Sequence, residues 1–149
     1  MLTCTFENGQ TASLRHVVVD NLVARGTELL LVKRAEGLHH AGKWCLPGGY
    51  VERDETITQA ATREIMEETG YEVSNLELLR IKDNPDRRGE TRQNISFVHM
   101  CVAGERIGEP DAESTEQRWF SLDELPTKEE IAFDHFDNIQ LYLTTSRLG

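Results

Sequence analysis

The chain of 149 residues has few cysteines and no long apolar segment. Its three cysteines, Cys4, Cys45 and Cys101, are widely spaced and form no CxxC pair. This pattern argues against a disulfide framework and a zinc site, and it favours reduced thiols in a cytoplasmic protein. No apolar run approaches the roughly 20 residues of a membrane span. The first ten residues lack the basic and apolar parts of a secretory signal. We therefore expect no membrane partner.

Basic residues are also scarce. The chain holds 16 lysines and arginines against 26 aspartates and glutamates, which gives a formal net charge of −10. Without a basic run, we expect no non-specific binding to nucleic acid. An acidic protein can nevertheless bind a polyphosphate when clustered carboxylates first bind divalent cations. Carboxylate clusters are therefore the first candidates for a functional site.

The distribution of apolar residues predicts the strands of the protein. Residues 16–23 and 28–32 are largely apolar on either side of a short turn, which predicts a hairpin. Residues 35–49 hold four glycines and a proline, which predicts a loop. Further strands are expected at residues 71–81, 94–103 and 118–120. Since no repeat or linker interrupts this order, we expect a single domain over residues 1–149.

Residues 55–69 predict a central helix. Its expected buried positions, four residues apart on one face, are Ile57, Ala61 and Ile65. We expect Asp54 to cap the start of this helix and Gly70 to end it.

Two further helices are expected near the end of the chain. Residues 121–124 have the spacing of a capping box at the start of a short helix. Residues 134–144 predict an amphipathic helix, with expected packing residues Phe136, Ile139, Leu141 and Leu143. Strands first, a helix in the middle and a helix at the end predict an α+β fold or a sheet sandwiched between helices.

The central helix carries an acidic cluster. Glu64, Glu67 and Glu68 stand at positions i, i+3 and i+4, so their carboxylates share one face. Like charges at this spacing repel one another, and hard oxygen donors suit Mg²⁺ or Mn²⁺. Arg63 could orient one of the carboxylates, and the backbone carbonyl of Gly49 could join the metal ligands. The alternative is a solvated acidic helix face.

The residues around this cluster form a longer pattern. It resembles the Nudix box, G-x5-E-x7-R-E-U-x-E-E-x-G-U, in which U is a bulky aliphatic residue. The matching positions are Gly49, Glu55, Arg63, Glu64, Ile65, Glu67, Glu68 and Gly70. Chance would produce the strict positions in about one chain in a million. The last U position holds Tyr71, whose ring can fill an apolar strand position.

The resemblance continues outside the box. Residues 43–49, with the sequence KWCLPGG, are similar to the segment that leads into the box in this family. Residues 118–126, with the sequence RWFSLDELP, are similar to a segment near the family's C-terminus. The resemblance implies the Nudix fold, in which a mixed β-sheet lies between α-helices.

The resemblance also implies residue roles. Glu64, Glu67, Glu68 and the Gly49 carbonyl would bind Mg²⁺ or Mn²⁺, and Glu55 and Arg63 would support the geometry of the box. Metal-activated water would attack one phosphorus of a diphosphate.

A general base is expected in a later loop. Glu113, six positions before Trp119, matches the family pattern best; Glu116 is second, and Glu64 is the next candidate. A solvated acidic loop is the alternative for Glu113 and Glu116.

The substrate implied is ADP-ribose or a nucleotide sugar. Pro85 within residues 83–89, and the sequence IAFDH at residues 131–135, resemble segments of ADP-ribose pyrophosphatases. Candidate substrate-binding residues are Trp44, Tyr50, Arg87 and Arg88. Trp44 could equally be a core residue, and the two arginines could be solvated turn charges.

Other functions stay open. A house-cleaning nucleoside triphosphate pyrophosphohydrolase is the second candidate. A non-catalytic nucleotide-sensing module is the third, although such a sensor need not keep the charges of the box. The partner expected is a small nucleotide, and the resemblance implies a homodimer as a possibility.

Overall fold

The computed structural model describes residues 2–86 and 92–146. Its main element is a mixed sheet in the order β5-β4-β3-β7-β6, with β8 paired to β4. Strands β3 and β7 run parallel, and the other pairs are antiparallel. The strands are β3 (Val17–Arg25), β4 (Glu28–Arg34), β5 (Trp44–Cys45), β6 (Tyr71–Lys82), β7 (Ile95–Arg106) and β8 (Ser114–Ser121).

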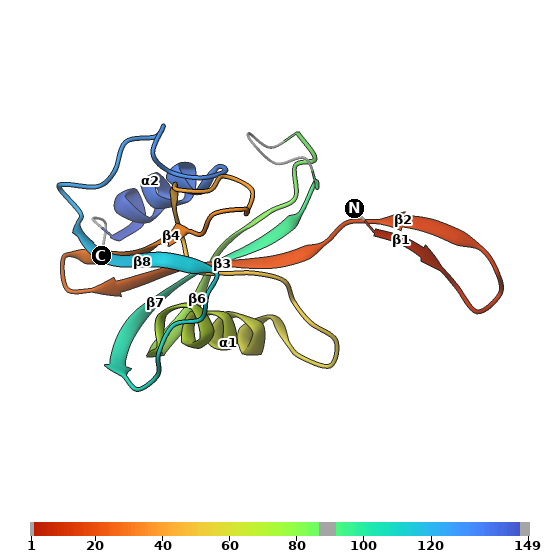
Figure 1. The fold of residues 1–149 in the computed structure, drawn as a ribbon, viewed down its shortest axis with the longest axis horizontal. Helices are drawn as coiled ribbons and strands as arrows, with labels where there is room; N and C mark the ends of the chain where they lie inside the picture. Colours follow the sequence, from red (N-terminus) through yellow and green to blue (C-terminus); the bar gives the residue numbers. More distant parts are fainter. Residues whose placement is uncertain (1, 87–91, 147–149) are drawn as a thin grey trace.

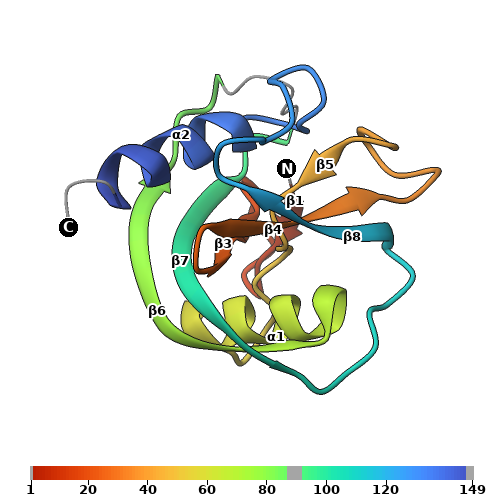
Figure 2. The same ribbon diagram turned by 90° about the vertical axis from the view of Figure 1, so that its left-hand side faces the viewer.

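Two helices cover the opposite faces of this sheet (Figures 1 and 2). They are α1 (Ile57–Thr69) and α2 (His135–Ser146). Successive side chains of strand β3 point to opposite faces of the sheet, so this strand packs against both helices. Its Leu22 packs with Ile139 of α2, whereas Val19 packs with Ala60 of α1. The predicted α+β fold, with a mixed sheet between helices, is confirmed. Within the described residues, neither helix has the length and apolar character needed to cross a bilayer.

Helix α1 begins later than predicted. Asp54 has a φ of 68°, whereas the residue that caps a helix start needs extended backbone. Thr56 has that conformation, and its hydroxyl accepts the Gln59 N–H at 3.2 Å. The side-chain oxygen of Gln59 in turn accepts the Thr56 N–H at 2.8 Å. Gly70 ends the helix as predicted, with a φ of 74° and an N–H donated to Met66 O.

Three predictions near the C-terminus need correction. Residues 121–124 form a turn and not a helix, because the Glu124 N–H donates to the backbone oxygen of Ser121 at 2.9 Å. Strand β8 begins at Ser114, four residues before its predicted start, because these residues pair with β4. In α2, Tyr142 packs against the main core cluster, which Leu141 does not join.

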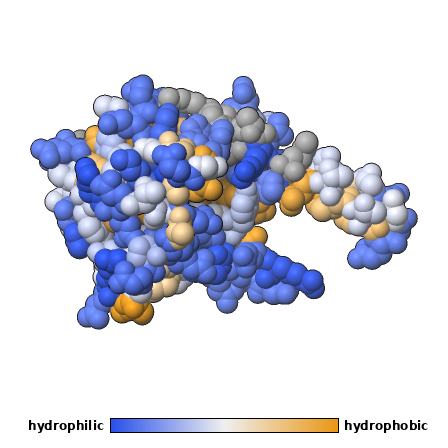
Figure 3. All heavy atoms as spheres, viewed as in Figure 1, coloured by the Kyte–Doolittle hydropathy of each residue, from blue (hydrophilic) through white to orange (hydrophobic). Residues whose placement is uncertain are grey.

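An N-terminal hairpin was not predicted. Strands β1 (Leu2–Thr5) and β2 (Thr11–Leu14) form a separate sheet that projects from the body (Figure 1). Leu2 pairs with Leu14 in this hairpin, and both are exposed. Apolar residues are visible on this arm, whereas much of the face shown in Figure 3 is hydrophilic. The signal was Asn8-Gly9, a common turn sequence between two extended segments.

Candidate active site

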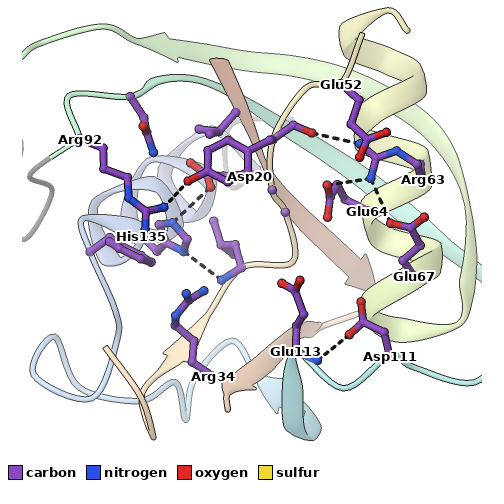
Figure 4. Close-up of a pocket in the computed structure, with 17 residues that line it drawn as sticks. Asp20, Arg34, Glu52, Arg63, Glu64, Glu67, Arg92, Asp111, Glu113 and His135 are labelled. Carbon is purple, nitrogen blue, oxygen red and sulfur yellow. Dashed lines mark hydrogen bonds and ion pairs between the residues drawn. The ribbon is translucent and has the colours of Figure 1, made fainter. Parts of the chain in front are cut away.

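A pocket of about 300 Å³ opens where the loop after β5 meets α1, the start of β8 and the start of α2. One side is acidic, and the other carries cationic and aromatic groups (Figure 4). The residues of the acidic side are Glu52, Glu64, Glu67, Asp111 and Glu113, and a further aspartate of the lining, Asp20, pairs with His135. The facing groups include Arg34, Tyr50, Arg92, Phe133 and His135. With cations bound at its carboxylates, such a pocket would suit a ligand with an anionic centre and a flat, partly apolar part.

The glycine-rich loop reaches the pocket along strand β3. The Val19 N–H donates to Gly49 O at 2.9 Å, and the Val51 N–H donates to Val17 O at 3.0 Å. A Cβ at Gly48 would lie 2.0 Å from the backbone oxygen of Val19, so only glycine fits there. The Gly49 carbonyl thus already accepts one hydrogen bond and keeps a second lone pair for a cation.

Arg63 organises the start of the helix. Its guanidinium donates to Glu55 through Nε and Nη2, at 3.0 and 2.7 Å. Nη2 also donates to the backbone oxygen of Tyr50 at 3.0 Å, and Nη1 donates to Glu64 at 2.8 Å and Glu67 at 3.0 Å. These five bonds match the five N–H groups of the side chain. Because Arg63 donates two of them to Glu55, the pKa of that carboxyl falls to about 2.

The carboxylates of Glu64 and Glu68 lie in surroundings that disfavour their charged forms. Glu68 is 5% exposed, and its Oε2 accepts the Gly48 N–H at 2.9 Å. Burial, together with the nearby charges of Glu64, Asp111 and Glu113, raises the pKa of Glu68 to about 8. Burial likewise raises the pKa of Glu64. A bound cation would favour the charged carboxylates and so lower the pKa values of both residues.

The acidic residues do not yet form a compact metal cage. Among residues 2–86 and 92–146, no three His, Cys, Asp or Glu side chains lie close enough to hold a metal ion. The hydrogen bonds of the helix carboxylates explain why they point in different directions. Arg63 holds Glu64 and Glu67 through one nitrogen, while Glu68 points to Gly48. Glu68 lies beneath the pocket and is not among the residues that line it.

Glu113 and Glu116 have different surroundings. Glu113 lines the pocket, where its carboxylate faces α1 (Figure 4). Its N–H donates to Asp111 Oδ1 at 2.9 Å, and the Asp111 N–H donates to Glu67 O at 2.8 Å. Glu116 lies outside this pocket and pairs with Arg118 and with Lys33, its neighbour on β4.

The family model of the NUDIX domain matches residues 14–142. The chain belongs to the Nudix family. An ADP-ribose pyrophosphatase of Methanocaldococcus jannaschii is 37% identical over 129 residues, which cover 85% of this chain and 72% of that protein. An oxidized purine nucleoside triphosphate hydrolase of Danio rerio is 42% identical over 108 residues, which cover 70% of this chain and 65% of that protein. The sequence therefore has similar relatives with different named substrates.

A Nudix hydrolase structure from Nitrosomonas europaea superimposes with a TM-score of 0.74 at 26% identity, covering 95% of this chain and 77% of that one. Together these relationships make the chain a Nudix hydrolase that acts on pyrophosphate bonds. The family generally uses divalent metal ions. Within it, the chain is similar to ADP-ribose pyrophosphatases.

The candidate substrate residues of this Nudix protein lie in three different settings. Tyr50 lines the pocket, and its hydroxyl accepts a hydrogen bond from Arg92. Trp44 is 7% exposed and packs in the core, where its ring meets Phe120 edge to face at 4.9 Å. The structure thus places Trp44 away from the pocket, in the alternative role of a core residue. Arg87 and Arg88 lie outside the described residues.

Asp20 and His135 line the Nudix pocket and were not among the expected site residues. His135 Nδ1 accepts the Leu46 N–H at 3.0 Å, so the neutral ring carries its proton on Nε2, which lies 3.2 Å from Asp20. Asp20 also accepts a hydrogen bond from Ser96. The available signal was Asp20-Asn21, two polar residues inside an apolar strand. His135 therefore ties the start of α2 to the loop that leads into the box.

Arg34, Arg92, Asn94, Asp111 and Phe133 also line the pocket and were not among the expected site residues. They come from four separate segments, and no local spacing relates them. Only the residues of the box share a pattern that one stretch of sequence reveals.

Proposed function

We propose that the chain hydrolyses the diphosphate bond of a nucleoside diphosphate linked to another moiety, with ADP-ribose or a nucleotide sugar favoured. The observation that carries this proposal is the two-sided pocket. Its carboxylates face cationic and aromatic groups across one cavity of about 300 Å³. A diphosphate bound through cations would lie on the acidic side, and the nucleoside would lie toward Arg34 and Phe133.

We further propose Mg²⁺ or Mn²⁺ as the cofactor. The donor set supports it, because Glu64, Glu67, Glu68 and the Gly49 carbonyl offer only hard oxygen atoms. The pKa values of Glu64 and Glu68 are raised, first by burial and then by neighbouring carboxylates, and a divalent ion would offset both causes. Such an ion would supply charge neutralisation of the diphosphate and a more acidic bound water.

The protein's own residues would divide the remaining work. Glu113 would accept the proton of the attacking water, since its carboxylate is free of the ion pairs that hold Glu116 and faces the helix carboxylates. Arg63 would keep Glu64 and Glu67 oriented, and Glu55 would hold Arg63. We further propose that residues 1–149 form a single Nudix domain, as the sequence predicts.

Two alternative functions remain candidates. The relative from Danio rerio is named for oxidized purine nucleoside triphosphates, which keeps a triphosphate substrate as the second candidate. A non-catalytic nucleotide sensor is the third. Against it stand four hydrogen bonds of Arg63, which hold the carboxylates of Glu55, Glu64 and Glu67 in the box although clustered like charges repel one another.

A nucleotide panel tests these alternatives directly. The protein is incubated with Mg²⁺ or Mn²⁺ and ADP-ribose, nucleotide sugars or nucleoside triphosphates, and products are identified with and without added phosphatase. ADP-ribose should yield AMP and ribose phosphate, whereas a triphosphate would yield pyrophosphate or inorganic phosphate. Glu68→Gln serves as the inactive control. Binding of a nucleotide without any hydrolysis would instead establish the sensor.

The quaternary structure remains a separate prediction. A homodimer is what the family resemblance implies, and light scattering after size-exclusion chromatography would test it. A mass of 16.9 kDa, that of one chain, would contradict it.

A further inference from the structure

Phe133 occupies an unfavourable backbone conformation at the edge of the pocket. Its φ is 53°, in the left-handed region that residues other than glycine, asparagine and aspartate seldom adopt. Such residues persist where the surrounding structure holds them, and they often belong to functional sites. Here the neighbouring backbone is fixed: the Ala132 N–H donates to Trp44 O at 2.8 Å, and the His135 N–H donates to Ala132 O at 3.3 Å.

The aromatic ring of Phe133 is also held from several sides. It packs on the small cluster of Val32, Cys45 and Ala132. His40 meets the ring edge to face with centroids 4.6 Å apart, and His135 lies at 5.3 Å. A ring fixed in this way could receive a ligand without a large loss of side-chain freedom.

The side chain of Arg34 lies next to Phe133 on this side of the pocket. The guanidinium of Arg34 lies 5.1 Å from the centroid of the Phe133 ring. Its Nε donates to the backbone oxygen of His39 at 2.6 Å, which fixes its position. Both Arg34 and Phe133 line the cavity that Glu64 and Glu113 line from the acidic side. A planar base is the part of a nucleotide that suits an aromatic ring beside a guanidinium.

We propose that Phe133 is a specificity-determining residue whose ring, supported by Arg34, stacks on the purine base of the nucleotide substrate. This inference rests on the proposed function and deepens it. The base would lie on Phe133 while the diphosphate lies at the carboxylates. The alternative occupant of this side is the ribose phosphate on the other end of the diphosphate.

Direct binding of the two product halves separates these occupants. Isothermal titration calorimetry in Mg²⁺ measures the Kd of AMP and of ribose 5-phosphate for the wild type, Phe133→Asn and Phe133→Tyr. Asparagine tolerates the left-handed backbone but has no aromatic ring, whereas tyrosine keeps the ring. We expect Phe133→Asn to weaken AMP about tenfold or more, since base stacking is worth roughly that factor. Ribose 5-phosphate should bind unchanged, and Phe133→Tyr should behave like the wild type.

Steady-state kinetics supply a second readout. In Phe133→Asn the KM for ADP-ribose should rise by a similar factor, while kcat stays within a few-fold. Unchanged AMP binding in Phe133→Asn, or a loss confined to ribose 5-phosphate, would overturn the assignment. Absence of AMP binding to the wild type would overturn it as well. If Asn impairs folding, as a lowered Tm would show, Phe133→Gly provides a second ringless variant with the same expectations.

The two proposals can fail separately. AMP binding that depends on Phe133, without hydrolysis of any nucleotide, would refute the proposed enzyme and keep the base-binding role. Hydrolysis of ADP-ribose, together with AMP binding that the Phe133 variants do not change, would support the proposed enzyme and refute the base-binding role.

Discussion

Gly49 lies directly against the carboxylate of Glu64. A Cβ added at Gly49 would stand 2.6 Å from Cδ and from both carboxylate oxygens of that side chain. Glu64 could move aside only by disturbing the hydrogen bond that Arg63 donates to its Oε1 at 2.8 Å. The glycine at the start of the box is thus required by a helix side chain fifteen positions later.

Gly49→Ala should therefore damage catalysis more than folding. We expect the methyl group to displace the Glu64 carboxylate and to lower kcat by ~10²-fold, since small misplacements at a reacting centre have effects of that size. The Tm should change little. Gly108→Ala is the control, because its Cβ would make only an ordinary 3.4 Å contact with Met66 Sδ. Full activity in Gly49→Ala would show that the position of Glu64 is unimportant.

Glu68→Gln should abolish most activity in a folded protein. Glutamine can still accept the Gly48 N–H through its side-chain oxygen, but it offers the metal no charge. We expect kcat at saturating Mg²⁺ to fall by roughly 10²-fold or more. Circular dichroism and Tm verify the fold. A kcat near that of the wild type would remove Glu68 from the metal ligands.

Divalent metal should stabilise the protein. Glu64, Glu67 and Glu68 repel one another without a cation, and a ligand at 100 times its Kd adds about 2.7 kcal/mol to the free energy of unfolding. For a chain of this size that gain corresponds to a rise in Tm of roughly 5–10 °C. Thermal unfolding in EDTA and in millimolar Mg²⁺ or Mn²⁺ measures it. The triple variant Glu64→Gln, Glu67→Gln, Glu68→Gln should show no rise, and an equal rise in both proteins would argue against this site.

Glu113→Gln and Glu116→Gln should differ sharply. Loss of a positioned base costs ~10²–10⁴-fold in rate, so Glu113→Gln should lower kcat by that order and leave KM within a few-fold. Glu116→Gln should retain activity, because the Glu116 carboxylate pairs with Lys33 and Arg118 outside the pocket. Reversed results would move the role to Glu116. Normal activity in both variants would leave Glu64 as the next candidate.

The Glu55–Arg63 pair should make stability depend on acid pH. The folded pKa of Glu55, about 2, lies below the ordinary value of 4.5, because Arg63 donates two hydrogen bonds to the carboxylate. A depressed pKa stabilises the fold above pH 4.5, and this contribution is lost as the pH falls toward 2.

Glu55→Gln should accordingly lower the Tm at pH 7, by an amount that shrinks below pH 4.5 and disappears near pH 2. Thermal unfolding across this range gives the comparison. In an Arg63→Gln background the same substitution should have little pH-dependent effect. If the difference in Tm between the wild type and Glu55→Gln stayed constant from pH 7 to pH 2, the lowered pKa of Glu55 would not be its cause.

The sequence by itself determined the parts of this protein that depend on neighbouring residues. The spacing of Ile57, Ala61 and Ile65 defined the packed face of α1, on which Ala61 and Ile65 are buried and Ile57 is partly buried, and Gly70 defined its end. The same spacing placed Glu64, Glu67 and Glu68 together. A helix repeats every 3.6 residues whatever surrounds it, so the face on which each side chain lies can be read locally.

Only the tertiary structure decided how distant segments contribute to the pocket. Glu113 and Glu116 are three residues apart, and their separation into pocket and exterior follows from the pairing of β8 with β4, which shifts register between Lys33 and Arg34. Leu46 and His135 are 89 positions apart and meet through one hydrogen bond. Trp44 is a core residue because β5 pairs with β4 and places its ring against Phe120. Strand pairing and loop closure depend on contacts between remote residues, so local sequence patterns do not specify them.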